Sequence, residues 1–456
     1  MLLLILLIIH LSLLVNTRFT LWPEMVVYPY LLNNGFLLYK DIINPYPPLL
    51  IGFLSVFSKI VGYKVLPFQV LTWLIILVID ISIFFVTQKL FKKSSQAFFS
   101  TLFFVILSIP FLINGLWFDL VQTPLIIFAF YFFYQYLSKK KSKQLFFSFF
   151  LLTIAFFIKQ QILWIIAFFL IIMFIKFGSK TKNILLKNFY ILLPFLILLV
   201  LQIIFFSSTG LLGDFFYWTL YFPFFKASQI PGYVLLPTIK QLIVIFGLLF
   251  FFVPVFLIKK RIRPIILIGT VLTLFAYPRF DYFHLIPSLS ILSIASYENL
   301  KLFASFKNKA VLISLIGLLI LTVFTLKYFS KNWTQEVRFF ERDIMTTSLF
   351  INKITNSDEP IYIQNGPDQI LPLATRLPLK PWADEFPWYL EIPKVQDRII
   401  DGLKVQHPRF ILFKPYESGS QYQIGAYRPK KLADYIDQNY QDFVQINHSF
   451  WLKIKK

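Results

Sequence analysis

A single carboxylate, Glu24, follows directly after the first apolar run of the chain, between Pro23 and Met25. At the end of a membrane span the dielectric constant falls, which disfavours the charged form of a carboxylate and raises its proton affinity. Such a carboxylate can act as a general base that takes a proton from a hydroxyl or an amine. The same position also suits an interface carboxylate that meets water, so position alone leaves both interpretations open.

Further ionisable side chains stand at the ends of later apolar runs: Asp119 in GLWFDLVQTP, Lys159 in IKQQ, and Arg279, Asp281 and His284 in YPRFDYFHLIP. Ionisable groups at membrane ends are costly unless they have a partner or a wet cavity, so together they suggest a polar pocket. A cation in it would stabilise the charge that builds on a phosphate leaving group. The alternatives are a lysine that snorkels to the interface and an Asp281–His284 hydrogen-bonded pair.

The composition defines the setting of these groups. Of 456 residues, 57% are hydrophobic and 14% are charged, whereas soluble domains carry about 25% charged residues. Apolar runs such as Val311 to Leu326 approach the roughly 17 residues that cross a bilayer core. We therefore predict a polytopic α-helical membrane protein. The chain has no cysteine, which excludes disulfides, thiolate metal sites and thiol nucleophiles.

The basic residues indicate topology. The formal charge of +22 comes from lysines clustered between apolar runs, which argues against a nucleic-acid-binding surface. Five loops hold 18 basic residues, which makes these loops cytoplasmic and places the alternate loops and the C-terminal tail outside. The five loops are 89–93, 138–144, 176–188, 259–263 and 301–309. About eleven spans are expected, at 1–15, 67–88, 96–113, 123–137, 145–158, 162–175, 189–206, 237–258, 265–277, 284–297 and 310–326.

Acidic residues divide the chain into two predicted domains. Residues 1–326 hold seven of the 22 acids and form the transmembrane domain, whose first outer loop covers residues 16–66. Within that loop, residues 45–62 predict an amphipathic helix in the outer interface. Residues 327–456 hold the other acids and predict a small extracytoplasmic α/β domain. Its expected strands are 360–364, 409–414 and 443–454, and its expected helices are 392–405 and 430–440.

The first outer loop resembles that of GT-C type glycosyltransferases, a superfamily that includes protein O-mannosyltransferases and aminoarabinose transferases. An acid directly after the first span is followed by YPY at 28–30, a glycine, YKD at 39–41 and YPPL at 46–49. The family usually carries an Asp-Glu pair where this sequence has Pro23-Glu24. The resemblance therefore implies that Glu24 is the base, and that Tyr39 and Asp41 lie in the substrate site.

The resemblance also extends to the later groups, in the same chain order. Asp119 resembles the carboxylate before the fourth span, and Lys159 resembles a lysine in a short outer turn that approaches the carrier phosphate. Trp218 lies in a segment that resembles an aromatic outer loop, and Arg279, Asp281 and His284 stand at another outer end. Trp22, Tyr39 and Trp218 could stack on sugar faces, although interface anchoring explains outer aromatic residues equally well.

These observations predict an inverting membrane glycosyltransferase at the outer face of the cytoplasmic membrane. It would transfer a sugar from a polyprenyl-phosphate carrier to a lipid, glycan or protein acceptor. Glu24 would deprotonate the acceptor, Asp119 would position the acceptor or a metal, and Lys159 with Arg279 would hold the phosphate. Glu24 and Asp119 could hold Mg²⁺ or Mn²⁺ through oxygen ligands, although no dense acidic motif supports a metal site.

Two other classes of protein stay open. A transporter or lipid flippase would place polar residues near the middle of the membrane and would have paired halves, and no repeat is evident here. A non-catalytic membrane scaffold whose outer domain binds a partner fits the division of the acids as well as an enzyme does. The identities of the sugar and the acceptor are not encoded in any recognisable pattern.

Overall fold

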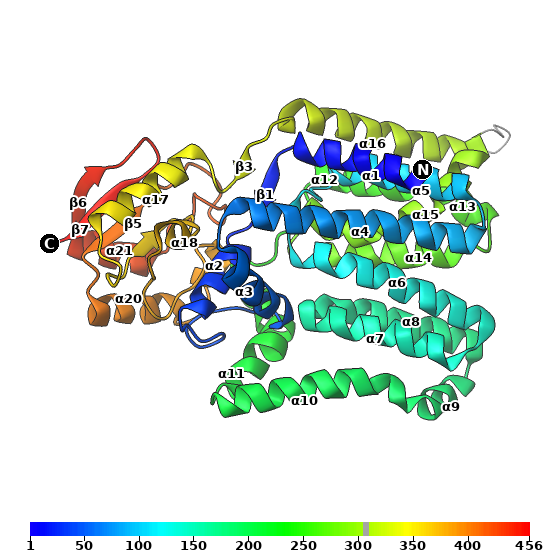
Figure 1. The fold of residues 1–456 in the computed structure, drawn as a ribbon, viewed down its shortest axis with the longest axis horizontal. Coiled ribbons are helices and arrows are strands. Elements are labelled where there is room, and N and C mark those ends of the chain that lie inside the picture. Colours follow the sequence, from blue (N-terminus) through cyan, green and yellow to red (C-terminus); the bar gives the residue numbers. More distant parts are fainter. Residues whose placement is uncertain (304–309) are drawn as a thin grey trace. The chain divides into compact units, whose positions relative to one another are not determined.

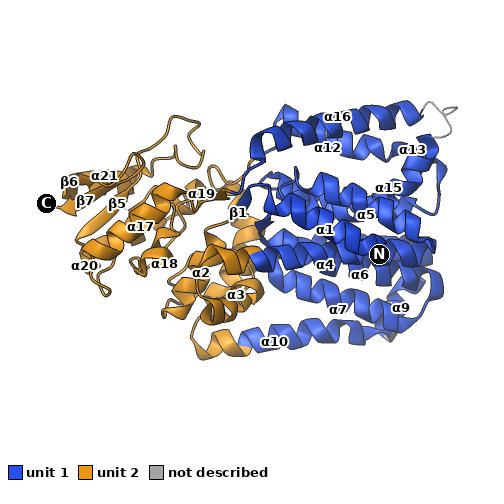
Figure 2. Cartoon of the chain, turned by 45° about the horizontal axis from the view of Figure 1, so that its top comes forward, with its two compact units in different colours: residues 1–19, 70–203, 236–335 blue, residues 20–69, 204–235, 336–456 orange. Residues whose placement is uncertain are grey.

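The computed structural model describes residues 1–303 and 310–456 (Figure 1). The chain forms two compact units (Figure 2). Unit 1 comprises residues 1–19, 70–203 and 236–335, and unit 2 comprises residues 20–69, 204–235 and 336–456. Unit 2 thus groups most of the predicted first outer loop with the C-terminal region. The division into functional domains at residue 326 stays a prediction.

Unit 1 is mostly helical, and each of the eleven predicted spans coincides with a helical segment. Among the described residues, six helical segments are long and apolar enough to cross a membrane. They are Val65–Phe91 (α4), Phe118–Lys139 (α6), Gln160–Phe177 (η1 and α8), Phe189–Ser208 (η2 and α10), Ile239–Ile258 (α12 and α13) and Ala310–Asn332 (α16). Shorter apolar helices are Leu2–Val15 (α1), Ser94–Ser108 (α5), Ser142–Ile158 (α7) and Arg263–Ala276 (α14 and η5), and Ile286–Phe303 (α15) completes the set. The polytopic helical fold is confirmed, and the count of eleven spans stays a prediction.

The long helices are apolar on more than one face. In α16, Leu321 is buried, while Leu312, Leu319 and Leu326 are each about two-thirds exposed. Exposing so many leucines to water would be unfavourable, whereas the acyl chains of lipids can cover them. The buried side of α16 packs tightly, because a Cβ atom at Gly317 would lie 2.6 Å from the carbonyl oxygen of Gly247 in α12. Small residues let membrane helices approach closely in this way.

Some buried polar side chains of unit 1 bond to partners on other helices. Asp80 in α4, which we expect to meet a polar neighbour, accepts from His10 Nδ1 of α1 at 2.7 Å. His10 Nε2 lies 3.3 Å from Ser108 Oγ at the end of α5. All three side chains are fully buried, so the network joins three helices where no water could satisfy these groups.

Unit 2 contains a four-stranded sheet in the order β4-β5-β7-β6. The strands are Tyr362–Gln364 (β4), Phe410–Phe413 (β5), Tyr440–Gln445 (β6) and Trp451–Lys455 (β7). β4 pairs with β5 in parallel, and the other pairs are antiparallel. Helices Arg342–Ile354 (α17), Ile370–Ala374 (α18), Pro387–Leu390 (α19), Val395–Gln406 (α20) and Lys430–Asn439 (α21) alternate with the strands, which confirms the predicted α/β class.

The prediction of one strand over residues 443–454 is wrong, because the segment is a hairpin. Asn447 Oδ1 accepts from the backbone N–H groups of Ser449 and Phe450, both at 3.0 Å. The N–H of Ile446 donates to the carbonyl of Phe450 at 2.9 Å. An Asn side chain that bonds backbone two residues on is a turn signal, and it separates β6 from β7.

The predicted first outer loop contributes two helices to unit 2, Glu24–Asn33 (α2) and Leu49–Val61 (α3). Asn33 joins them, since its Nδ2 donates to the carbonyl of Ser55 at 3.0 Å and its Oδ1 accepts from Ser55 Oγ at 2.6 Å. α3 confirms the helix predicted within residues 45–62 and begins after Pro48, where a missing N–H costs least. Its interfacial position stays a prediction.

Candidate functional site

Three of the predicted site residues meet inside unit 1. Lys159 Nζ donates to Asp119 Oδ2 at 2.8 Å, and His284 Nδ1 lies 2.9 Å from the same oxygen. Lys159 Nζ and His284 Nδ1 are 3.5 Å apart. The side chains of Asp119, Lys159 and His284 are 0%, 5% and 10% exposed, so this charged cluster is buried.

Local structure explains how each member of this cluster is held. Asp119 stands in the first turn of α6, where the helix dipole favours a negative charge. Lys159 has an extended backbone between α7 and η1, and Gln122 Nε2 fixes that turn by donating to its carbonyl at 2.8 Å. His284 lies in the 3₁₀ turn Tyr282–Leu285 (η6), which Asp281 caps by accepting from the N–H of Tyr282 at 2.6 Å.

The charged cluster is electrically close to balanced. The Asp119 carboxylate offsets the charge of the Lys159 ammonium. Asp119 Oδ1 has no hydrogen-bond partner within the described part of the chain, so one oxygen remains for a ligand. Removing one partner of a buried ion pair typically costs about 3–5 kcal/mol, because the other charge stays buried alone. The cluster can therefore hold a cation at a fixed point and bind a polar ligand beside it.

Glu24 is the first residue of α2 in unit 2 and is only 2% exposed. Its negative charge raises the pKa of Asp368, after the larger effects of burial, Asp384 and Glu385. Burial also raises the pKa of Tyr28 well above its usual value, and the charges of Asp384 and Glu24 add to the effect. Glu24 thus shares its surroundings with carboxylates from the C-terminal region.

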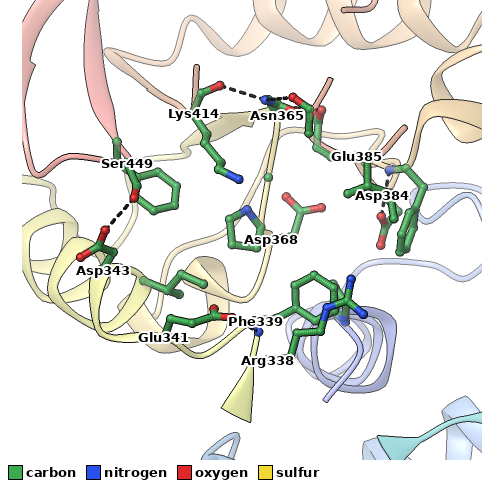
Figure 3. A pocket seen from close by; sticks show the side chains of 18 of the residues that line it. Arg338, Phe339, Glu341, Asp343, Asn365, Asp368, Asp384, Glu385, Lys414 and Ser449 are labelled. Atoms are coloured by element: carbon green, nitrogen blue, oxygen red, sulfur yellow. Dashed lines mark hydrogen bonds between the residues drawn. The ribbon is translucent and has the colours of Figure 1, made fainter. Parts of the chain in front are cut away.

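A pocket of about 530 Å³ lies in unit 2, with Pro23 in its wall (Figure 3). Its charged lining residues are Glu336, Arg338, Glu341, Arg342, Asp343, Asp368, Asp384, Glu385 and Lys414. Phe339, Phe386 and Phe450 supply aromatic surface, and Asn365 and Ser449 supply polar groups. The mixture of carboxylates, cations and rings suits a polar organic ligand such as a carbohydrate.

Hydrogen bonds fix two of these carboxylates. Glu385 accepts from the hydroxyl of Tyr362 at 2.6 Å and from the N–H of Asn365 at 3.1 Å. Asp384 Oδ1 accepts from the N–H of Phe386 at 3.1 Å. Burial raises the pKa of Asp384 to about 8 and that of Glu385 to about 7. Both groups can therefore exchange protons near neutral pH.

The sequence analysis missed these acids. Asp384 and Glu385 stand in the segment PWADEFPW at 381–388, where Trp382, Phe386 and Trp388 surround them. An acidic pair inside an aromatic stretch is atypical of a solvated surface, and that pattern was the available signal. The fifteen acids of residues 327–456 together predict a polar domain, and this composition hides the one acidic pair that lies among aromatic residues.

The other predicted residues are placed as follows. Asp41 Oδ2 pairs with Lys380 Nζ at 3.1 Å within unit 2. Tyr39 is buried and donates to the carbonyl of Tyr46 at 2.9 Å. Trp218 is buried against Phe222, with ring centroids 5.0 Å apart. Arg279 and Asp281 are half-buried in unit 1. Binding roles for these five side chains stay predictions.

A metal site gains no support from the described residues. Among them, no group of three or more His, Asp or Glu side chains has a geometry that could hold a metal ion. The predicted pair, Glu24 and Asp119, belongs to different units. Mg²⁺ or Mn²⁺ binding therefore stays a prediction.

Comparisons with known proteins identify the class of fold. No protein-family model matches the sequence, and no curated protein matches it. The structure is similar to ArnT from Cupriavidus metallidurans bound to undecaprenyl phosphate, with 11% identity, a TM-score of 0.57, and 98% of this chain and 96% of that chain covered. For apo ArnT the identity is 12%, the TM-score is 0.58, and the coverage is the same.

A second similar protein is the Archaeoglobus fulgidus oligosaccharyltransferase in complex with zinc and sulfate, with 10% identity and a TM-score of 0.50. That match covers 99% of this chain and 73% of the other. The chain therefore has the GT-C membrane fold, as the motifs of the first outer loop predicted. At these identities the likeness defines the fold alone.

Proposed function

We propose that the protein is an integral-membrane glycosyltransferase that moves a sugar from a polyprenyl-phosphate carrier to an acceptor on the outer face of the cytoplasmic membrane. The observation that carries the proposal is the buried Asp119–Lys159–His284 cluster in a GT-C fold. A buried cation held at a fixed point suits a phosphate, and the similar ArnT structure is bound to undecaprenyl phosphate.

In the proposed reaction, an acceptor oxygen or nitrogen attacks the anomeric carbon of the sugar. The bond from that carbon to the phosphate oxygen breaks, and its electron pair stays on the phosphate. Lys159 stabilises this growing negative charge as a point cation, which is most effective where water is excluded. Asp119 acts as a positioning residue that keeps the ammonium charged and aimed. Attack opposite to the phosphate would invert the anomeric configuration.

The acceptor's proton goes to Glu24 in this scheme. Glu24 is only 2% exposed at the first position of α2, and its charge raises the pKa of the neighbouring Asp368. A carboxylate within hydrogen-bond reach of the acceptor can accept a proton in the reaction and release it afterwards.

Purified variants test the role of Glu24. Glu24→Gln keeps size and hydrogen-bonding capacity but removes basicity, so transfer should fall by about 10²–10⁴-fold. Asp401→Asn, which changes an exposed carboxylate of α20, is the matched control. Transfer from a polyprenyl-phosphate sugar is measured at saturating donor, with melting temperature as the folding control. Normal turnover in Glu24→Gln would refute its role as the base.

Asp41 and Asp119 are the alternatives for that role. If Glu24→Gln keeps near-normal turnover and either Asp41→Asn or Asp119→Asn loses it, the base is reassigned to the sensitive residue. Normal rates in all three variants would contradict the transferase function itself and favour a flippase or a scaffold.

A further inference from the structure

Three of the acids that line the unit 2 pocket are Asp368, Asp384 and Glu385. Asp368 and Asp384 are each 3% exposed. No ion pair joins any of the three to a basic side chain within the described ranges, 1–303 and 310–456. Buried carboxylates are normally paired or bind a cation, because isolated charges are costly in a low dielectric.

Two of the basic residues in the pocket wall are engaged elsewhere. The Arg338 guanidinium lies over the rings of Phe339 and Trp22, at 4.8 Å and 5.4 Å. Lys414 Nζ pairs with Glu417 at 2.7 Å. Neither contact is with Asp368, Asp384 or Glu385, and no ion pair to Arg342, the third basic residue of the lining, is present among the described residues.

One carboxylate oxygen of the pocket lining has no hydrogen-bond partner in the described chain. Asp384 Oδ2 is buried and has no hydrogen-bond partner among the described residues, whereas its Oδ1 is held by the N–H of Phe386. Unlike Glu385, whose two oxygens both accept hydrogen bonds, Asp384 thus has an acceptor ready for a donor that the chain does not supply. A buried acceptor in this state is unfavourable until a donor bonds to it.

The geometry favours an organic cation over a metal ion. The described residues contain no cluster of three acids with metal-binding geometry, whereas an ammonium group needs only hydrogen-bond acceptors and negative charge. The cavity of about 530 Å³ is also far larger than an ion requires. Phe339 and Phe386 in its wall could cover the carbon skeleton that carries the ammonium.

We propose that this pocket binds the acceptor through a primary ammonium group, with Asp384 and Asp368 as its counter-ions. The inference rests on the proposed function for the assignment to the acceptor, because Pro23 lines the pocket and Glu24, the proposed acceptor base, follows it. The acceptor is therefore an amine-bearing molecule, such as an amino sugar or an aminated lipid headgroup.

Binding to the full-length protein in uncharged detergent at pH 8.5 tests the site without turnover. The probe is 1-amino-1-deoxyglucitol, whose aliphatic amine resembles that of lysine and stays charged below about pH 10. Glucitol and the N-acetylated amine are the uncharged controls. Calorimetry should show saturable binding of the amine, at least about 10-fold tighter than that of either control.

Two variants locate the binding. The Asp384→Asn variant keeps an oxygen that can accept from the N–H of Phe386. Asp384→Asn and Asp368→Asn should each weaken amine binding about 10-fold or more, with an unchanged or higher melting temperature. Asp401→Asn should bind like the wild type. No saturable binding of the amine, or equal binding of the N-acetylated control, would overturn the proposal. Saturable Mg²⁺ or Mn²⁺ binding that is lost in Asp384→Asn would overturn it in favour of a metal site.

A competition experiment tests whether the pocket binds the acceptor or the donor. Undecaprenyl phosphate glucose should leave amine binding intact, and displacement of the amine by this donor would overturn the assignment to the acceptor. Amine binding in a protein that shows no transfer would refute the proposed function alone. Transfer activity in a protein that binds no amine would refute this inference alone.

Discussion

The buried carboxylates of unit 2 should give the protein an unusual dependence of stability on pH. Folding raises the pKa of Asp384 from 3.8 to about 8 and that of Glu385 from 4.5 to about 7. The folded state therefore holds more protons than the unfolded state between pH 4 and pH 8, and stability falls as pH rises through this window. An acid that is paired with a cation contributes stability that instead rises as pH rises.

The Asp384→Asn variant isolates this effect. A rise from 3.8 to about 8 corresponds to at most about 6 kcal/mol above pH 8, and almost none of it is present near pH 4. The charged groups around the site are Glu24, Glu336, Glu341, Asp343, Asp368, Glu385, Arg338, Arg342 and Lys414. Since acids outnumber bases there, removing one carboxylate should stabilise the protein at high pH.

Thermal unfolding in uncharged detergent at pH 4.5, 6.5 and 8.5 measures the effect. The melting temperature of Asp384→Asn should match that of the wild type at pH 4.5 and exceed it increasingly at the two higher values. Asp401→Asn, in an exposed position of α20, should follow the wild type throughout. Parallel curves for Asp384→Asn and the wild type would refute the argument that Asp384 is buried as an unmatched acid.

Three further predictions concern unit 1 and the topology. Lys159→Ala should lower both donor use and melting temperature, because the buried Asp119 carboxylate loses its ammonium partner and keeps only His284. The double variant with Asp119→Asn should recover the melting temperature and not donor use. Lys159→Arg should keep part of the activity. Unchanged donor saturation in Lys159→Ala would reduce the residue to a snorkelling lysine. Gly317→Ala should lower the melting temperature, since overpacking costs about 1–3 kcal/mol, whereas Gly52→Ala, which meets no atom within 4 Å, should not. Reporter fusions at Lys141 and Lys456 should lie on opposite sides of the membrane, and finding both on one side would refute the topology.

The helical fold was predictable because continuous apolar runs report membrane spans directly. The strands at residues 362–364 and 410–413 were predictable from short apolar runs with turn residues beside them. The hairpin at Asn447 was missed because the aromatic and aliphatic residues on both sides conceal a turn set by one side chain. The hydrophobic pattern of a sequence predicts burial and the type of secondary structure well, but it does not predict hydrogen bonds made by side chains.

The candidate site was predictable in part for the same reason. Asp119, Lys159 and His284 stand at the ends of apolar runs, and charges in such positions need partners. Sequence alone could not pair them, because 40 and 125 residues separate Lys159 from Asp119 and His284. Asp384 and Asp368 lie in a polar region where exposure is the default expectation, so their burial depends on tertiary packing that no local pattern encodes.

Mass spectrometry of polyprenyl-phosphate-linked sugars in a strain lacking this protein tests the central claim most directly. The account predicts that one lipid-linked sugar accumulates, that the wild-type protein removes it, and that Glu24→Gln inserts normally but leaves it in place. Asp401→Asn should remove it as the wild type does. An unchanged pool of lipid-linked sugars in the deletion strain, or full clearance by Glu24→Gln, would contradict the account.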